Sequence, residues 1–399
     1  MNNTVSSERK HIGFFGMRNS GKSSLVNAFT GQQLSIVSDT LGTTTDPVRK
    51  TMELLPLGPV VIIDTPGIDD EGDLGRMRVN SALRILNTID IAILVIDITK
   101  GIQPYDELLI SKFKENKTNY IVAFNKSDID TSAAADTPLL KADNSILVSA
   151  QNNHNIEQLK EMVAHIIKDT PNDKYIISDL IIPGDVVVLV VPIDSSAPKG
   201  RLILPQQMVI RELLEAGAIS VVTREHELQI TLDSLGKTPA MIVTDSQAFG
   251  FVSNIVPDNI PLTSFSILMM RYKGDLPTAV KGAEALDLIE NGDKILICEG
   301  CTHHRQCEDI GTVKLPDWIT GYTGKNIDFN FTSGHEFPTD SQSLSDYALV
   351  IHCGGCMLTE KEVHNRMDIA SSVVPFTNYG VTIAKINGIL DRSLEVFNG

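Results

Sequence analysis

The chain has 399 residues, which is too many for one hydrophobic core and predicts two or three domains. The hydrophobic content is 42 % and the charged content 21 %, and no apolar run approaches the ~20 residues of a membrane-spanning helix. The net charge of -16 repels phosphate backbones, and no dense Lys/Arg run offsets it, so we expect no nucleic-acid partner. The polar stretch Met1 to Lys10 has no apolar segment, so we expect a cytoplasmic protein without membrane attachment.

The first 170 residues alternate apolar strands with helical segments. We expect a helix that begins at Lys22 and strands at 12–15, 60–63, 91–97, 120–124 and 146–148. Such alternation predicts a mostly parallel sheet covered by helices, which is an α/β domain spanning residues 1–170. The polar, proline-containing stretch 168–174 is then expected to be a linker.

Two smaller α/β domains are predicted after this linker, at 175–265 and 266–399, with no internal repeat at solenoid spacing. The middle domain has predicted strands at 185–191, 219–223 and 241–244, with helices near 206–216 and 224–235. It carries no phosphate loop and no acid/base or histidine cluster, so we expect a structural or oligomerisation role. The third has predicted strands at 294–298, 327–331 and 348–352.

A phosphate-binding loop is predicted where the first strand gives way to the first helix. The sequence Gly16-Met-Arg-Asn-Ser-Gly-Lys-Ser23 matches G-x-x-x-x-G-K-[ST] in the context that this motif requires. Backbone N–H groups would cradle the phosphates, Lys22 would neutralise the β/γ oxygens, and Ser23 would bind Mg²⁺. Ser24 is expected beside the α-phosphate. Alone, this motif fits an ATPase as well as a GTPase.

Later motifs favour guanine as the base. Asp64-Thr-Pro-Gly67 follows a strand, so Asp64 can hold Mg²⁺ through water and the Gly67 N–H can reach the γ-phosphate. Asn125-Lys126-Ser-Asp128 follows another strand, and the Asp128 carboxylate can accept both N–H groups of guanine. Adenine would leave that carboxylate unpaired, which is a large penalty.

Two more motifs complete the predicted nucleotide site. Ser149-Ala150 follows the last strand of the domain, and Thr44 would supply the switch I hydroxyl for Mg²⁺. The motifs come in the order of a GTPase, each at the carboxyl end of a strand, where open α/β sheets bind ligands. We expect catalytic roles for Lys22, Thr44, Asp64, Gly67 and Asn19. The residues expected to bind the nucleotide are Gly16, Met17, Arg18, Asn19, Ser20, Gly21, Lys22, Ser23, Ser24, Thr44, Asp64, Gly67, Asn125, Lys126, Asp128, Ser149 and Ala150.

These residues resemble the TrmE/Era-like GTPases over about the first 170 positions. Ile68 stands where a Ras-like chain has a water-orienting Gln, and no arginine finger is recognisable. We assign Arg18 no catalytic role. Asn19 matches the residue that coordinates K⁺ in relatives, so the resemblance implies a K⁺-stimulated GTPase with slow intrinsic hydrolysis.

All five cysteines fall between Cys298 and Cys356. Cys298-Glu-Gly-Cys301-Thr-His303 and His352-Cys353-Gly-Gly-Cys356 each follow an apolar strand, so parallel pairing of those strands would bring the groups together. They could be buried cysteines, a zinc site that includes Cys298 and Cys301, or an iron-sulfur site on Cys301, Cys353 and Cys356. We favour iron-sulfur, with a non-cysteine fourth ligand left open among His303, His352 and the loop at 335–336. Cys307 receives no role.

The pattern Cys301-x-His303 … His352-Cys353-x-x-Cys356, joined to a GTPase, resembles the HydF-type FeFe-hydrogenase maturation GTPases along the whole chain. The resemblance implies a dimeric 4Fe-4S scaffold or carrier. Its partners would be two radical-SAM maturases, which help build a di-iron precursor, and the apo-hydrogenase that receives it. The alternatives are a tRNA-modification or ribosome-assembly GTPase with a zinc module, and an interaction protein that only binds GTP. Intact Lys22, Thr44 and Asp64 argue against the last.

Overall fold

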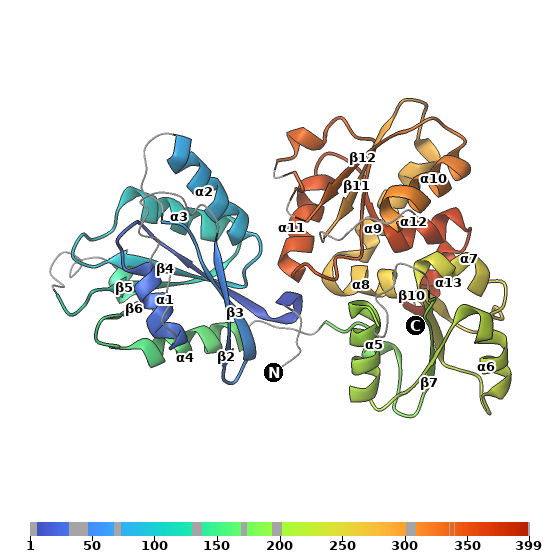
Figure 1. Cartoon of the computed structure of the whole chain (residues 1–399), viewed down its shortest axis with the longest axis horizontal. Helices are drawn as coiled ribbons and strands as arrows, with labels where there is room; N and C mark the ends of the chain where they lie inside the picture. The colour runs from blue at the N-terminus through green and yellow to red at the C-terminus, as the bar shows by residue number, and fades with distance from the viewer. Residues whose placement is uncertain are drawn as a thin grey trace. The chain divides into compact units, whose positions relative to one another are not determined.

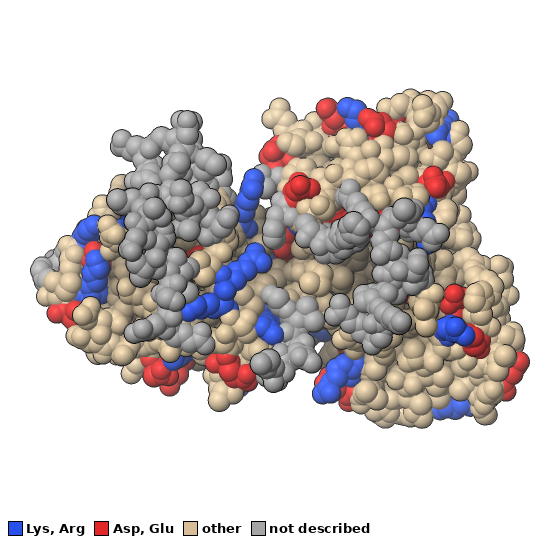
Figure 2. Space-filling model, viewed as in Figure 1, with Lys and Arg blue, Asp and Glu red and all other residues tan. Residues whose placement is uncertain are grey.

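The computed structural model describes residues 6–31, 47–67, 73–129, 138–168, 174–193, 202–300, 309–334, 336–338 and 340–397. The chain divides into two compact units, Met1–Asn172 and Asp173–Gly399 (Figure 1). Acidic and basic side chains are interspersed over the described part of the face in Figure 2. No helix within the described ranges has the length and apolar character needed to cross a membrane.

The first unit is built on one six-stranded sheet in the order β2-β3-β1-β4-β5-β6. Every neighbouring pair is parallel except β2 and β3, so the predicted mostly parallel sheet is confirmed. The antiparallel edge strand β2 was not predicted, because its alternating burial gives no continuous apolar run. The strands are β1 Lys10–Phe15, β2 Val48–Leu54, β3 Gly58–Asp64, β4 Ile91–Asp97, β5 Asn119–Asn125 and β6 Ser145–Leu147.

Helices cover both faces of this sheet (Figure 1). One core joins the sheet to α1 (Lys22–Thr30) and α4 (Ile156–Lys168), and a second core joins it to α2 (Asp73–Leu86) and α3 (Pro104–Glu115). Successive residues of β1 point into opposite cores. Phe14 packs edge-on against Phe29 of α1, and Phe15 packs edge-on against Phe113 of α3. Burial on both faces explains why the central strands are apolar throughout.

The second unit contains two four-stranded parallel sheets with the same topology. The orders β8-β7-β9-β10 and β12-β11-β13-β14 both place the first strand in sequence second from the edge, beside the second and third strands. The strands are β7 Val186–Val190, β8 Ile219–Thr223, β9 Met241–Thr244, β10 Leu262–Ser264, β11 Lys294–Glu299, β12 Asp328–Ser333, β13 Leu349–His352 and β14 Phe376–Asn378. The unit therefore contains the same strand topology twice in tandem, which the sequence analysis did not predict.

The last strand of each repeat leads directly into a helix. Ser264 caps α8 and Asn378 caps α12, each by accepting a backbone N–H of the first turn. Helix α8 contributes to the cores of both repeats. The helices of the unit are α5 Leu204–Glu215, α6 Leu228–Ser234, α7 Phe249–Val252, α8 Phe265–Lys273, α9 Leu276–Ala283, α10 Leu315–Thr323, α11 Glu360–Ser371, α12 Tyr379–Ile386 and α13 Leu390–Leu394.

Candidate functional site

The phosphate loop lies between β1 and α1, as predicted. Gly16, Asn19 and Gly21 have φ values of 150°, 64° and 83°, which turn the chain sharply before the helix begins at Lys22. At Gly21 a Cβ atom would overlap the side-chain amide of Asn125. Glycine is therefore required there by both the backbone conformation and the close approach. This turn leaves the amino end of α1 available to an anion.

Two of the predicted Mg²⁺ residues, Ser23 and Asp64, meet at the carboxyl end of β3. Lys22 forms an ion pair with Oδ1 of Asp64, and the Ser23 hydroxyl donates to Oδ2 of the same carboxylate at 2.7 Å. Lys22 and Asp64 are largely buried. A carboxylate and a hydroxyl oxygen in contact are suited to hold Mg²⁺ directly or through water, and Lys22 would then turn to the phosphates.

Asn125 joins the phosphate loop to the predicted base pocket. Its Nδ2 donates to the carbonyl of Ser20 at 3.0 Å, and its Oδ1 accepts the N–H of Ala150 at 3.0 Å. Lys126, at φ 67°, donates to the carbonyl of Asn19 at 2.8 Å. The three predicted motifs are thus linked by direct hydrogen bonds.

Asp128 and Ser149 form the far side of the nucleotide site. The buried Ser149 hydroxyl donates to Oδ1 of the exposed Asp128 at 2.5 Å. Ser149 also accepts the N–H of Asn152 at 3.2 Å, which holds the hydroxyl in place. This arrangement orients the carboxylate and leaves its other oxygen available to a base.

The remaining predicted residues surround this site or lie outside the described part of the chain. Gly67 approaches the phosphate loop, since a Cβ atom there would lie 3.1 Å from Cα of Arg18. Met17, Arg18 and Ser20 lie in the loop, and Ser24 lies in the first turn of α1. Thr44 and Ile68 fall outside the described residues.

Asp97 is a part of this site that the sequence analysis missed. It ends β4 directly beside Asn125 of β5, and Oδ2 accepts from Lys126 at 2.6 Å. Burial raises the pKa of Asp97, but hydrogen bonds from Lys126 and Thr99 outweigh it and hold the pKa below its ordinary value. The sequence feature that could have indicated Asp97 is an aspartate at the carboxyl end of β4, the strand that pairs with β5.

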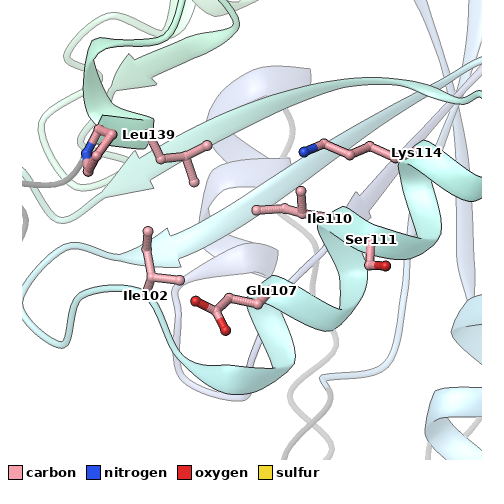
Figure 3. Close-up of a pocket in the computed structure, with 7 residues that line it drawn as sticks. Ile102, Glu107, Ile110, Ser111, Lys114 and Leu139 are labelled. Carbon is pink, nitrogen blue, oxygen red and sulfur yellow. The ribbon is translucent and has the colours of Figure 1, made fainter.

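Two hollows lie beside α3. A cavity of about 200 Å³ lies behind the phosphate loop, between Met17–Ser20 and the segment from Val95 to Asp106. Oδ1 of Asp106 and Oγ of Ser20 are buried there with no hydrogen-bond partner in the described chain. A second hollow of about 460 Å³, shown in Figure 3, is mainly apolar, with Ile102, Ile110 and Leu139 on its walls. It contains no element of the GTPase motifs.

The cysteine segments converge at one sheet edge, as the sequence analysis expected. β11 and β13 are parallel neighbours, and Cys298 pairs in register with His352. β12 lies on the other side of β11 and ends at the same edge. Cys353 and Cys356 follow β13 and are partly exposed there. Cys301, His303, Cys307 and His335 lie outside the described residues.

The surroundings of Cys353 fit a metal-bound thiolate. Its Sγ accepts backbone N–H groups from Gly300 at 3.1 Å and from Gly355 at 3.4 Å. Such bonds stabilise negative charge on sulfur and are one of the ways proteins tune iron-sulfur clusters. The residues present therefore fit a cluster, although the described residues alone contain no group of three or more metal-ligating side chains.

Cys298 and His352 have different surroundings. Cys298 is fully buried, and burial raises the pKa of its thiol to about 12, which disfavours the thiolate that a zinc pair with Cys301 needs. β13 ends at His352, the condition under which this ring and Cys353 could both reach a metal. However, His352 is fully buried, with Nδ1 donating to the Cys353 carbonyl at 2.8 Å and Nε2 accepting from Arg366 at 3.3 Å.

Arg366 of α11 organises the polar groups beneath this edge. It is buried and also donates to Glu362 and to the carbonyl of Gly334, both at 2.6 Å. Burial, and then the charge of Arg366, lower the pKa of His352 to about 3. His352 is therefore neutral, and both ring nitrogens are occupied within the protein.

Comparison with known families identifies all three parts of the chain. Residues 11–126 match the 50S ribosome-binding GTPase family, and together with the strand order and motif geometry they define the first unit as a P-loop GTPase domain. Residues 176–274 match the hydrogen maturase F dimerization domain, and residues 277–396 match the hydrogen maturase F tetramerization domain. The last two matches together cover more than half of the sequence. The chain belongs to the HydF-type hydrogenase maturation GTPases.

Individual relatives match the GTPase part. GTPase Era from Caldicellulosiruptor saccharolyticus is 29 % identical over 42 % of this chain and 58 % of its own length. The tRNA modification GTPase MnmE from Desulforamulus reducens is 33 % identical over 41 % of this chain and 36 % of its own. The chain thus spans less than two thirds of these relatives. A solved structure of Aquifex aeolicus Era is 22 % identical, covering 57 % of this chain and 98 % of its own at a TM-score of 0.34.

Proposed function

We propose that this protein is a GTP-hydrolysing iron-sulfur scaffold or carrier in FeFe-hydrogenase maturation. The observation that carries the proposal is the pair of hydrogen maturase F matches that follow a P-loop GTPase domain. The protein receives a di-iron precursor built with radical-SAM maturases and delivers it to the apo-hydrogenase. GTP hydrolysis times partner binding or release.

In the GTPase domain, residues of the predicted motifs bind and orient the nucleotide. Lys22 neutralises the phosphate oxygens, Ser23 and Asp64 hold Mg²⁺, and Asp128 selects guanine. Thr44, which lies outside the described residues, supplies a further hydroxyl to Mg²⁺, and the Gly67 N–H contacts the γ-phosphate. Asn19 is proposed to bind K⁺, which supplies positive charge near the phosphates in place of an arginine finger. Its exposed position in the phosphate loop supports that role.

In the C-terminal module, Cys301, Cys353 and Cys356 would hold a 4Fe-4S cluster. When bound, the cluster supplies an iron that exogenous ligands can reach. The fourth ligand is proposed to be a histidine, and His303 is preferred to His352 because both ring nitrogens of His352 are already occupied. The module boundaries are proposed at 1–170, 175–265 and 266–399, and the middle module is proposed to form a cytoplasmic homodimer.

A reconstitution assay tests this function. Anaerobically purified protein is incubated with GTP and the two radical-SAM maturases, separated from them, and added to apo-FeFe-hydrogenase, and hydrogen evolution is measured. We expect activation by wild-type protein and none by Cys353→Ala. Activation by the cysteine variant would contradict the proposal, as would a bound zinc ion in place of iron.

A further inference from the structure

Lys273 is a buried lysine whose side chain ends at the cysteine turn. It is the last residue of α8, and only 1 % of its surface is exposed. Its Nζ donates to the carbonyl of Leu358 at 2.9 Å and to that of Cys356 at 3.2 Å. Burying an ammonium is costly unless it is hydrogen-bonded, so a lysine at this depth calls for an explanation.

The turn that Lys273 holds is the one that presents Cys353 and Cys356. Gly355, at φ 63°, reverses the chain, and the N–H of Leu358 closes the turn on the Gly355 carbonyl at 3.0 Å. α11 follows at once, capped by Thr359. Since Lys273 binds the carbonyls of Cys356 and Leu358, it restrains the carboxyl-terminal half of this turn.

α8 is itself held at its other end. Nδ2 of Asn378 donates to the Ser266 carbonyl at 2.9 Å, and the N–H of Gly380 donates to the Ser266 hydroxyl at 3.2 Å. A Cβ atom at Gly380 would lie 2.8 Å from that of Ser266, so α8 and α12 approach closely. α8 therefore cannot shift easily, and its terminal lysine is placed by a rigid element.

The contact with Lys273 places a positively charged group beside the cysteine turn. A cluster on Cys301, Cys353 and Cys356 carries negative charge, which increases when the cluster accepts an electron. A nearby buried ammonium stabilises the reduced form more than the oxidised form, because the low-polarity interior screens the interaction weakly. Net charge near a cluster is one of the main determinants of its reduction potential.

We propose that Lys273 is a positioning residue for the iron-sulfur site, which holds the Cys356 turn and raises the reduction potential of the cluster. The proposal rests on the proposed iron-sulfur function. It also assigns α8, which lies within the segment matching the dimerization family, a direct role in the properties of the cluster in the next module.

Redox titration of reconstituted variants, followed by EPR, tests the proposal. Lys273→Met removes the charge at similar size, Lys273→Arg keeps it, and Lys281→Met on the exposed part of α9 is the control. We expect Lys273→Met to change the ratio of reduced to oxidised cluster at fixed potential about tenfold toward oxidised, which is ~59 mV for one electron. The arginine and control variants should keep the wild-type potential.

The possible results distinguish failure of the iron-sulfur function from failure of the role proposed for Lys273. A wild-type protein without iron would refute the function itself. A wild-type potential in an iron-loaded Lys273→Met variant would overturn the role of Lys273 and leave the function intact. If Lys273→Met binds no iron, Lys273→Arg decides: retained iron at the wild-type potential supports the proposal. A folded arginine variant without iron would overturn the proposal, because a positive charge at this position would then not suffice to hold the site.

Discussion

Cys298 and His352 face each other in register across β11 and β13, and the N–H of Cys353 donates to the Cys298 carbonyl at 2.8 Å. This pairing brings two segments that are distant in sequence to one sheet edge. It also gives the two cysteines different surroundings, because Cys298 is enclosed by the sheet whereas Cys353 lies just beyond its end.

We predict different outcomes for those two cysteines. Cys353→Ala should abolish iron binding, because a thiolate ligand that accepts two N–H groups is lost. Cys298→Ala should retain iron, because this thiol is buried and its pKa is raised to about 12. Iron content of the two anaerobically reconstituted variants checks this. Equal loss of iron in both would contradict the separation.

Guanine selectivity should depend on Asp128. Asp128→Asn should weaken GTP binding by about 10–100-fold, because hydrogen bonds to a charged acceptor are lost, and should raise affinity for xanthosine nucleotides. Ser149 donates to this carboxylate, so Ser149→Ala should weaken GTP binding less and leave the preference for guanine over xanthine nucleotides unchanged. Titration with fluorescent nucleotides measures both. Unchanged GTP affinity of Asp128→Asn would remove Asp128 from the site.

Hydrolysis should be lost in Lys22→Ala without loss of the cluster, because the two sites lie in separate compact units. The expected fall in rate is on the order of a hundredfold or more, as for other charge-stabilising groups. Phosphate release and the visible spectrum of the same sample report the two properties. The exposed Lys141→Ala variant is the control, and loss of the cluster in Lys22→Ala would show that the units are not independent.

Potassium should stimulate hydrolysis severalfold over sodium at equal ionic strength, and replacement of Asn19 should remove the difference. Because φ of Asn19 is 64°, alanine would strain the loop there, whereas glycine would not. We therefore expect Asn19→Gly to remain folded and to respond equally to both salts. A Gly variant that keeps the potassium preference would refute this role.

Stability should depend on the protonation of Asp106. Burial raises its pKa to about 6, an effect partly offset by the Gln103 N–H. The folded state then binds more protons than the unfolded state between about pH 4 and 6, so stability falls as pH rises through that window. Asp106→Asn should flatten this slope and stabilise the protein at pH 7 by about 1–3 kcal/mol. Urea unfolding of the wild type and the variant at about pH 4, 6 and 7 measures the change in unfolding free energy with pH. The same pH dependence in both proteins would refute the prediction.

The sequence predicted where most of the nucleotide motifs lie in the fold, because each motif follows an apolar strand of the predicted sheet. It did not predict Asp97, which belongs to no motif and becomes part of the site only through the pairing of β4 with β5. Nor could it place Lys273, since a lone lysine at a helix end is normally exposed. The repeat of strand order in the second unit was not predicted either, because strand order depends on which strands pair and not on the residues of any one strand.

The contacts of His352 could not be predicted from the sequence either. Its place beside Cys353 suggests a ligand, but Arg366 reaches it from a helix that follows in sequence and occupies Nε2. That contact depends on how α11 packs beneath the sheet edge. Spacing along the chain contains no such information.

Iron and acid-labile sulfide analysis of anaerobically reconstituted protein tests the central claim most directly. We predict about four irons and about four sulfides per chain in the wild type, and neither in Cys353→Ala or Cys356→Ala. Zinc without sulfide in the wild type, or a full complement of iron in either cysteine variant, would contradict the account.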